Sequence, residues 1–140
     1  MQKIIKPTGF YRNKAKFINA VTNALIADFN SDIPHSIKEL ISLPGVARKT
    51  ANIVLSNAFG INEGIAVDTH VMRLSKRLGF TKETDRNKIE MDLMKLFPKK
   101  RWFEIPNLLI AHGRNICTAK RPAYEKCIVN HLCPSAFTFN

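Results

Sequence analysis

The chain has 140 residues, 45% of them hydrophobic, which is enough for one ordinary domain with a buried core. Its 22 lysines and arginines outnumber 11 aspartates and glutamates, giving a net charge of +11 that favours a polyanionic partner such as nucleic acid. No apolar run is long enough to span a bilayer, no signal-peptide pattern opens the chain, and the basic residues form no continuous amphipathic helix. We therefore expect a cytoplasmic protein with no membrane partner.

The first predicted element is a turn at Thr8-Gly9-Phe10-Tyr11, followed by a helix from about Asn13 to Asp28. One face of this helix carries apolar residues at helical spacing. The dipeptide Ile33-Pro34 separates it from the helix that Ser36 introduces. At the start of a helix, Phe10 is expected to act as a hydrophobic staple or a core aromatic unless it is exposed.

A helix-hairpin-helix is predicted over residues 36–59. Ser36 followed three residues later by Glu39 has the pattern of a capping box, which predicts the start of the first helix. That helix must end before Pro44, because proline cannot continue the hydrogen-bond ladder. Gly45 then permits a positive φ, so the sequence predicts a tight turn here.

The second helix of the hairpin is predicted to begin at about Ala47 and to end at Gly60, with an apolar stripe made of Ile53, Val54, Leu55 and Ala58. Such a turn directs backbone N–H groups and the positive end of a helix dipole outward, where Arg48 and Lys49 add charge. The pattern suits a phosphate oxygen. It is also typical of an ordinary joint between two helices of a bundle.

Three more helices are predicted in the second half: one through Val71 to Leu78 that Gly79 ends, one over 84–97 that Pro98 ends, and one over 102–116. In the last, Pro106 lies either near the first turn or at a kink. No segment alternates as a strand does, so the fold class is all-α. We expect a helical domain over residues 1–110 and a C-terminal, cysteine-containing loop region over 111–140 that packs on it.

The C-terminal region holds three cysteines, Cys117, Cys127 and Cys133. Clustered cysteines in a cytoplasmic chain indicate metal ligands more than a disulfide framework.

The string Leu43-Pro44-Gly45-Val46-Ala47-Arg48-Lys49-Thr50-Ala51-Asn52, followed by Val67-Asp68-Thr69-His70-Val71, closely resembles the endonuclease III family of base-excision DNA glycosylases. The resemblance extends from about Ile5 to the last cysteine. It implies a helix-hairpin-helix glycosylase fold with a partial helical barrel and an iron-sulfur-type loop. It also implies a bifunctional glycosylase and abasic-site (AP) lyase that acts on oxidised pyrimidines and abasic sites in double-stranded DNA.

In that family the lysine matching Lys49 attacks C1′ of the damaged nucleoside, and the aspartate matching Asp68 assists. The amine must be unprotonated to attack, and a place in the first helical turn beside Arg48 favours the neutral form. The alternative for Lys49 is a phosphate contact without covalent chemistry. The alternative for Asp68 is to cap the helix that starts at Thr69, which is compatible with catalysis.

The resemblance also implies a set of DNA contacts. Phe10 matches the position of a residue that wedges into the duplex where the damaged nucleotide is swung out. The predicted contacts are Phe10, Gly45, Val46, Ala47, Arg48, Thr50, His70, Lys120 and Arg121. For Lys120 and Arg121 the alternative is a solvated charged loop.

The family's iron-sulfur signature is C-x6-C-x2-C-x5-C, and here Tyr124 stands at the second position while the other spacings match. A 4Fe-4S cluster normally takes four thiolates. Three alternatives stay open: an incompletely ligated cluster, another metal such as zinc with His131, or a loop held by packing without metal. We expect a cluster that is lost or compromised.

Family members have several helices before the one that begins here near Asn13. We therefore expect a fragment, a misassigned start, or a reduced protein that completes its core with another chain. Uncovered apolar faces would then favour self-association. Two functions follow from the sequence: the glycosylase and lyase, or a non-catalytic helix-hairpin-helix module that keeps only DNA affinity.

Overall fold

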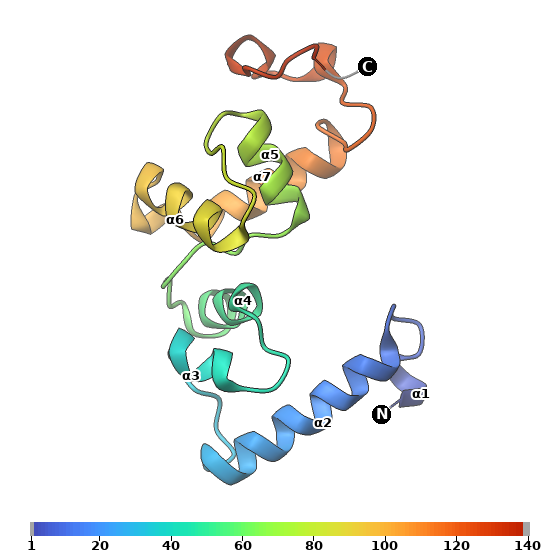
Figure 1. Ribbon diagram of the computed structural model, residues 1–140, viewed down its shortest axis with the longest axis vertical. Helices are drawn as coiled ribbons and strands as arrows, with labels where there is room; N and C mark the ends of the chain where they lie inside the picture. The colour runs from blue at the N-terminus through green and yellow to red at the C-terminus, as the bar shows by residue number, and fades with distance from the viewer. Residues whose placement is uncertain (1, 139–140) are drawn as a thin grey trace. The chain divides into compact units, whose positions relative to one another are not determined.

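The computed structural model describes residues 2–138, which contain helices and no strand, so the all-α prediction is confirmed (Figure 1). The residues group into two compact units, of which the first ends at Ile61 and the second begins at Asn62. Whether residues 111–140 form a region of their own stays a prediction. The α-helices are α1 (Gln2–Ile5), α2 (Tyr11–Asp28), α3 (Ile37–Ser42), α4 (Arg48–Phe59), α5 (Thr69–Arg77), α6 (Arg86–Leu96) and α7 (Glu104–Asn115). Short 3-10 helices lie at η1 (Lys99–Arg101), η2 (Tyr124–Lys126) and η3 (Asn130–Leu132).

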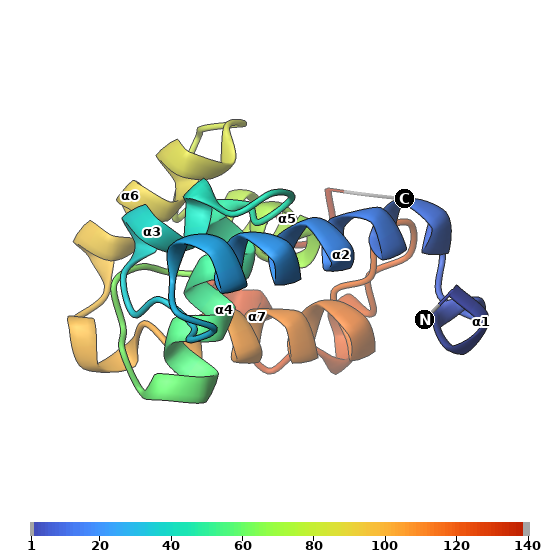
Figure 2. The same ribbon diagram turned by 90° about the horizontal axis from the view of Figure 1, so that it is seen from below.

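The first unit is built on the α3–α4 hairpin, whose helices pack against each other. Its core consists of buried side chains from both helices and their turn, covered in part by residues of α2: Ile37, Leu40, Leu43, Ala51 and Leu55, with Val21, Ala24 and Leu25 against them. Figure 2 shows α2 as one continuous helix, separated from the short α1 by the predicted turn.

The hairpin forms for the local reasons that its sequence contains. The Ser36 hydroxyl oxygen accepts from the Glu39 backbone N–H at 3.3 Å and donates to the Glu39 carboxylate at 2.6 Å, so the capping pair is present. Gly45 has φ 76° in the turn, and Gly60 ends α4 with φ 66°. Both are left-handed conformations that glycine adopts at little cost.

The second unit has α5 packed on α7 and α6. Its core residues are Ile65, Val67, Val71, Leu74, Ile89, Leu93, Ile105 and Leu109. The Asp85 carboxylate accepts from the N–H groups of Asn87 and Lys88, which explains why α6 begins at Arg86 and not at Thr84. Pro106 lies in the first turn of α7, where its missing N–H is tolerated. Within residues 2–138, no helix is long and apolar enough to cross a membrane.

Candidate functional site

The turn of the hairpin is exposed and sterically specified. Gly45 and Ala47 are exposed, and the N–H of Val46 donates to the carbonyl of Leu43 at 3.1 Å, which closes the turn. A Cβ at Gly45 would overlap the ring of Phe17 from α2. Both the positive φ and the nearby ring therefore require glycine here.

Lys49 is the second residue of α4, and its side chain is exposed, as is that of Thr50. The first N–H groups of an α-helix have no acceptor within the helix, and Ala47 at the N-cap has no side-chain oxygen to offer them. By contrast, Ser36, Asp68 and Asp85 cap their helices with side-chain oxygens. The start of α4 therefore presents donors and positive potential to an anion.

Asp68 lies at the N-cap of α5, where its Oδ1 accepts from the Val71 backbone N–H at 2.8 Å. The capping role expected for Asp68 is thus present. It uses one carboxylate oxygen. Lys49 belongs to the first unit and Asp68 to the second, so the predicted catalytic pair is drawn from both units.

Four other predicted DNA-contact residues lie outside the hairpin. Phe10 is the N-cap residue of α2, with φ 57°, and it is 86% exposed, so the expected core alternative is wrong. His70 lies in the first turn of α5, where its Nδ1 is 3.2 Å from Nη2 of Arg73. Lys120 and Arg121 are exposed in the loop after α7.

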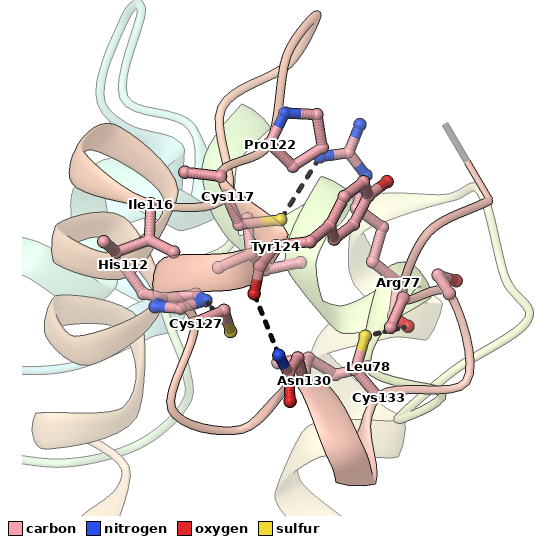
Figure 3. Close-up of a pocket in the computed structure, with 14 residues that line it drawn as sticks. Arg77, Leu78, His112, Ile116, Cys117, Pro122, Tyr124, Cys127, Asn130 and Cys133 are labelled. Carbon is pink, nitrogen blue, oxygen red and sulfur yellow. Dashed lines mark hydrogen bonds between the residues drawn. The ribbon is translucent and has the colours of Figure 1, made fainter. Parts of the chain in front are cut away.

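The three cysteines line one cavity of the second unit, together with residues from α5 and α7 (Figure 3). All three are free thiols and half-buried. Tyr124, the residue at the second signature position, lines the same cavity. The exposed His131 is not among the lining residues, whereas His112 is.

Arg77 of α5 anchors the start of the cysteine loop and is itself buried, with 8% exposure. Its Nη1 donates to Sγ of Cys117 at 3.2 Å and to the carbonyl of Thr118 at 2.7 Å, and its Nη2 donates to the carbonyl of Ala119 at 2.9 Å. One turn earlier, Nη2 of Arg73 donates to the carbonyls of Gly113 and Cys117 at 2.9 and 3.0 Å.

His112 and Arg77 contact cysteines of the loop, which the sequence did not predict. Arg73 and Arg77 stand one helical turn apart on α5, and His112 stands five residues before Cys117, but no spacing in the sequence links them to the loop. Nε2 of His112 lies 3.7 Å from Sγ of Cys127. Burial lowers the pKa of His112 below its usual value, because partial desolvation disfavours the charged imidazolium.

Residues 1–99 match the family model described as HhH-GPD superfamily base excision DNA repair protein. The chain belongs to this HhH-GPD superfamily. Relatives that are themselves endonuclease III proteins confirm the predicted resemblance to that family. The present chain is 51% identical to an endonuclease III of Synechocystis, over 97% of its own length and 62% of the length of that protein. It is 45% identical to an endonuclease III of Bacillus subtilis over 95% of its length and 61% of that protein.

A solved structure of a trapped endonuclease III–DNA covalent intermediate, an estranged-adenine complex, matches with a TM-score of 0.92 and 43% identity. The match covers 98% of this HhH-GPD chain and 64% of that one. The chain thus spans under two thirds of the length of these relatives.

The donor set does not fit the four-thiolate cluster that the endonuclease III signature implies. Three thiols line the cavity, and a phenol stands in place of the fourth. Over residues 2–138, no three His, Cys, Asp or Glu side chains are placed to hold a single metal ion. The alternative of zinc bound by these cysteines with the exposed His131 has no support in this geometry.

Proposed function

We propose that this chain carries the reactive lysine of a base-excision repair DNA glycosylase and AP lyase. Its substrates would be oxidised pyrimidines and abasic sites in double-stranded DNA. The observation that carries the proposal is the position of Lys49: exposed, in the first turn of the uncapped helix α4, within a chain that aligns with a trapped endonuclease III–DNA covalent complex.

The hairpin would hold one DNA phosphate. The backbone N–H groups of Gly45 and Ala47 and the dipole of α4 would face the phosphate oxygens. Val46, whose own N–H donates to Leu43, would lie beside them with Arg48 and Thr50. This contact recognises the backbone and not the sequence, so it would position any duplex with its strand against Lys49. Specificity for damage would come from the base that can be swung out of the stack.

The chemistry would proceed in balanced steps. The neutral Nζ of Lys49 attacks C1′, the C1′–N bond to the damaged base breaks, and the base leaves with a proton. Ring opening then gives a Schiff base between Nζ and C1′, which acidifies the C2′ proton. Loss of that proton and of the 3′ phosphate breaks the strand by β-elimination. Water finally hydrolyses the Schiff base and restores the lysine.

Asp68 would stabilise positive charge that develops on the sugar or would help to move protons. Its Oδ1 is engaged by the Val71 N–H, so the other carboxylate oxygen would take this role. The helix cap would then fix the orientation of the carboxylate as well as the start of α5.

The remaining predicted contacts would lie outside the reacting centre. Phe10, which is 86% exposed at the start of α2, would stack in the gap left by the extruded nucleotide. His70, Lys120 and Arg121 would contact phosphates. We also propose a cytoplasmic location, with the nucleoid as its site if the host is bacterial, and self-association through apolar side chains left exposed, such as Ile26 at 61%.

The second candidate function is a non-catalytic helix-hairpin-helix module with DNA affinity alone. The observation that favours it is the incomplete cysteine set, in which Tyr124 replaces a thiolate of the family's 4Fe-4S signature.

A strand-scission assay on a duplex with one abasic site tests the proposal. The wild-type chain should cut at that site, and Lys49→Ala should lose cutting. Lys38→Ala, which removes the same charge from an exposed position on α3, should keep it. Equal cutting by wild type and Lys49→Ala would refute the lysine chemistry. Binding of the duplex without any cutting by wild type would establish the second candidate instead.

A further inference from the structure

We propose that the cysteine loop of this chain folds without metal and binds no stable 4Fe-4S cluster, because Tyr124 and the arginines of α5 hold it instead. The inference concerns the second unit alone. It does not depend on the DNA chemistry proposed for Lys49.

Each of the three cysteine sulfurs has a partner within the second unit. Sγ of Cys133 lies 3.4 Å from the carbonyl oxygen of Arg77, to which it donates (Figure 3). Nη1 of Arg77 donates to Sγ of Cys117 at 3.2 Å, and Nε2 of His112 lies 3.7 Å from Sγ of Cys127.

The loop has protein partners where a cluster would otherwise organise it. The guanidinium of Arg77 joins Cys117, Thr118 and Ala119 through three hydrogen bonds, and that of Arg73 joins Gly113 and Cys117 through two. Charge-assisted hydrogen bonds of a buried guanidinium are among the stronger ones in proteins. They tie the end of α7 and the first turn of the loop to α5.

Tyr124 supplies packing at the position where the signature has a thiolate. Its ring lies 5.1 Å from that of Phe137, measured between centroids, at an interplanar angle of 39°. Its backbone carbonyl accepts from Nδ2 of Asn130 at 3.0 Å and from the N–H of Cys127 at 3.0 Å. These contacts connect the middle of the loop to its last turns. The ring contact thus links the middle of the loop to the residues that follow Cys133.

The test compares iron uptake by single-residue variants of the full chain. Wild type, Tyr124→Cys, Tyr124→Phe and Tyr11→Cys are incubated anaerobically with iron and sulfide, treated with a chelator and gel-filtered. Iron, acid-labile sulfide and visible absorbance per chain are then measured. Tyr11→Cys is the matched control, because it adds one thiol on α2, outside the cavity.

We expect only Tyr124→Cys to retain about four irons and four sulfides per chain. Wild type, Tyr124→Phe and Tyr11→Cys should stay at background. A chelator-resistant cluster in wild type would overturn the proposal, whether Tyr124→Phe keeps it or loses it. Background iron in Tyr124→Cys would also overturn it, because Tyr124 would then not be what distinguishes this loop from a cluster loop.

Hydrogen exchange tests the second half of the proposal, that arginine organises the loop. In wild type, a chelator should leave the protection of the Ala123, Cys127 and Cys133 amides unchanged. Arg77→Lys keeps the charge but cannot span three acceptors, so exchange of these amides should rise by about tenfold or more. Faster exchange in wild type on chelation, or unaltered exchange in Arg77→Lys, would contradict it.

Discussion

Substituting alanine for Gly45 separates backbone strain from steric overlap in the hairpin. Gly45 and Gly60 both have positive φ, 76° and 66°. Only Gly45 has a neighbour that a Cβ would strike, the ring of Phe17, whereas a Cβ at Gly60 would meet nothing within 4 Å. Gly60→Ala is therefore a control that carries the strain alone.

The expected magnitudes follow from these environments. A non-glycine residue in the left-handed region costs about 1–2 kcal/mol, so Gly60→Ala should lower the free energy of unfolding by about that amount. Gly45→Ala also displaces the ring of Phe17. Overpacking a well-packed core costs about 1–3 kcal/mol, and Phe17 is 50% exposed, so the added cost should lie near the low end, about 1 kcal/mol. The combined loss should be about 2–3 kcal/mol.

Urea unfolding followed by far-UV circular dichroism measures these losses, while the fluorescence of Trp102 reports on the second unit. Combining Gly45→Ala with Phe17→Ala removes the overlap, so the double variant should lose less than the sum of the single changes. If Gly45→Ala is no more destabilised than Gly60→Ala, the steric role assigned to Phe17 is wrong.

Three further predictions concern charge. Asp68→Asn keeps an oxygen that can cap α5, so it should abolish strand cutting without changing the free energy of unfolding. Asp68→Ala should abolish cutting and also lower the free energy of unfolding in urea by about 1 kcal/mol. Retained cutting in Asp68→Asn would show that the carboxylate charge is not needed. With ~4 phosphate contacts, DNA affinity measured by anisotropy should fall roughly a hundredfold between ~50 and ~200 mM salt, and a flat response would exclude them. Burial lowers the pKa of His112 from 6.5, so the unfolded chain takes up a proton more readily than the folded one. The melting temperature should therefore be highest above pH 6.5 and decline as the pH falls through 6.5, with a smaller decline in His112→Gln. Equal declines in the two proteins would show that His112 is not the cause.

The helices and their ends could be predicted where a local signal specifies them. Ser36 with Glu39, and the glycines at 45 and 60, act through contacts or dihedral angles of their own segments, and each is found as expected. The predicted stripe of α4 was only partly right. Leu55 is fully buried, but Ile53 is 40% exposed, because residues two apart on an α-helix point about 200° away from each other and cannot share one face.

The site was predictable in its residue types and less so in its surroundings. The hairpin and the Asp68 cap follow from short motifs. Arg77 and His112 were missed because their partners in the loop, Cys117 and Cys127, are 40 and 15 residues away in the chain. Nothing in local spacing connects such residues, and only tertiary packing brings them together.

The central claim is that Lys49 forms a Schiff base with DNA, and borohydride trapping tests it most directly. The wild-type chain is incubated with a duplex that holds one abasic site, reduced, digested and examined by mass spectrometry. We predict one covalent adduct, located on Lys49, that Lys38→Ala retains and Lys49→Ala lacks. An adduct on another lysine, an undiminished adduct in Lys49→Ala, or no adduct in wild type would contradict the account.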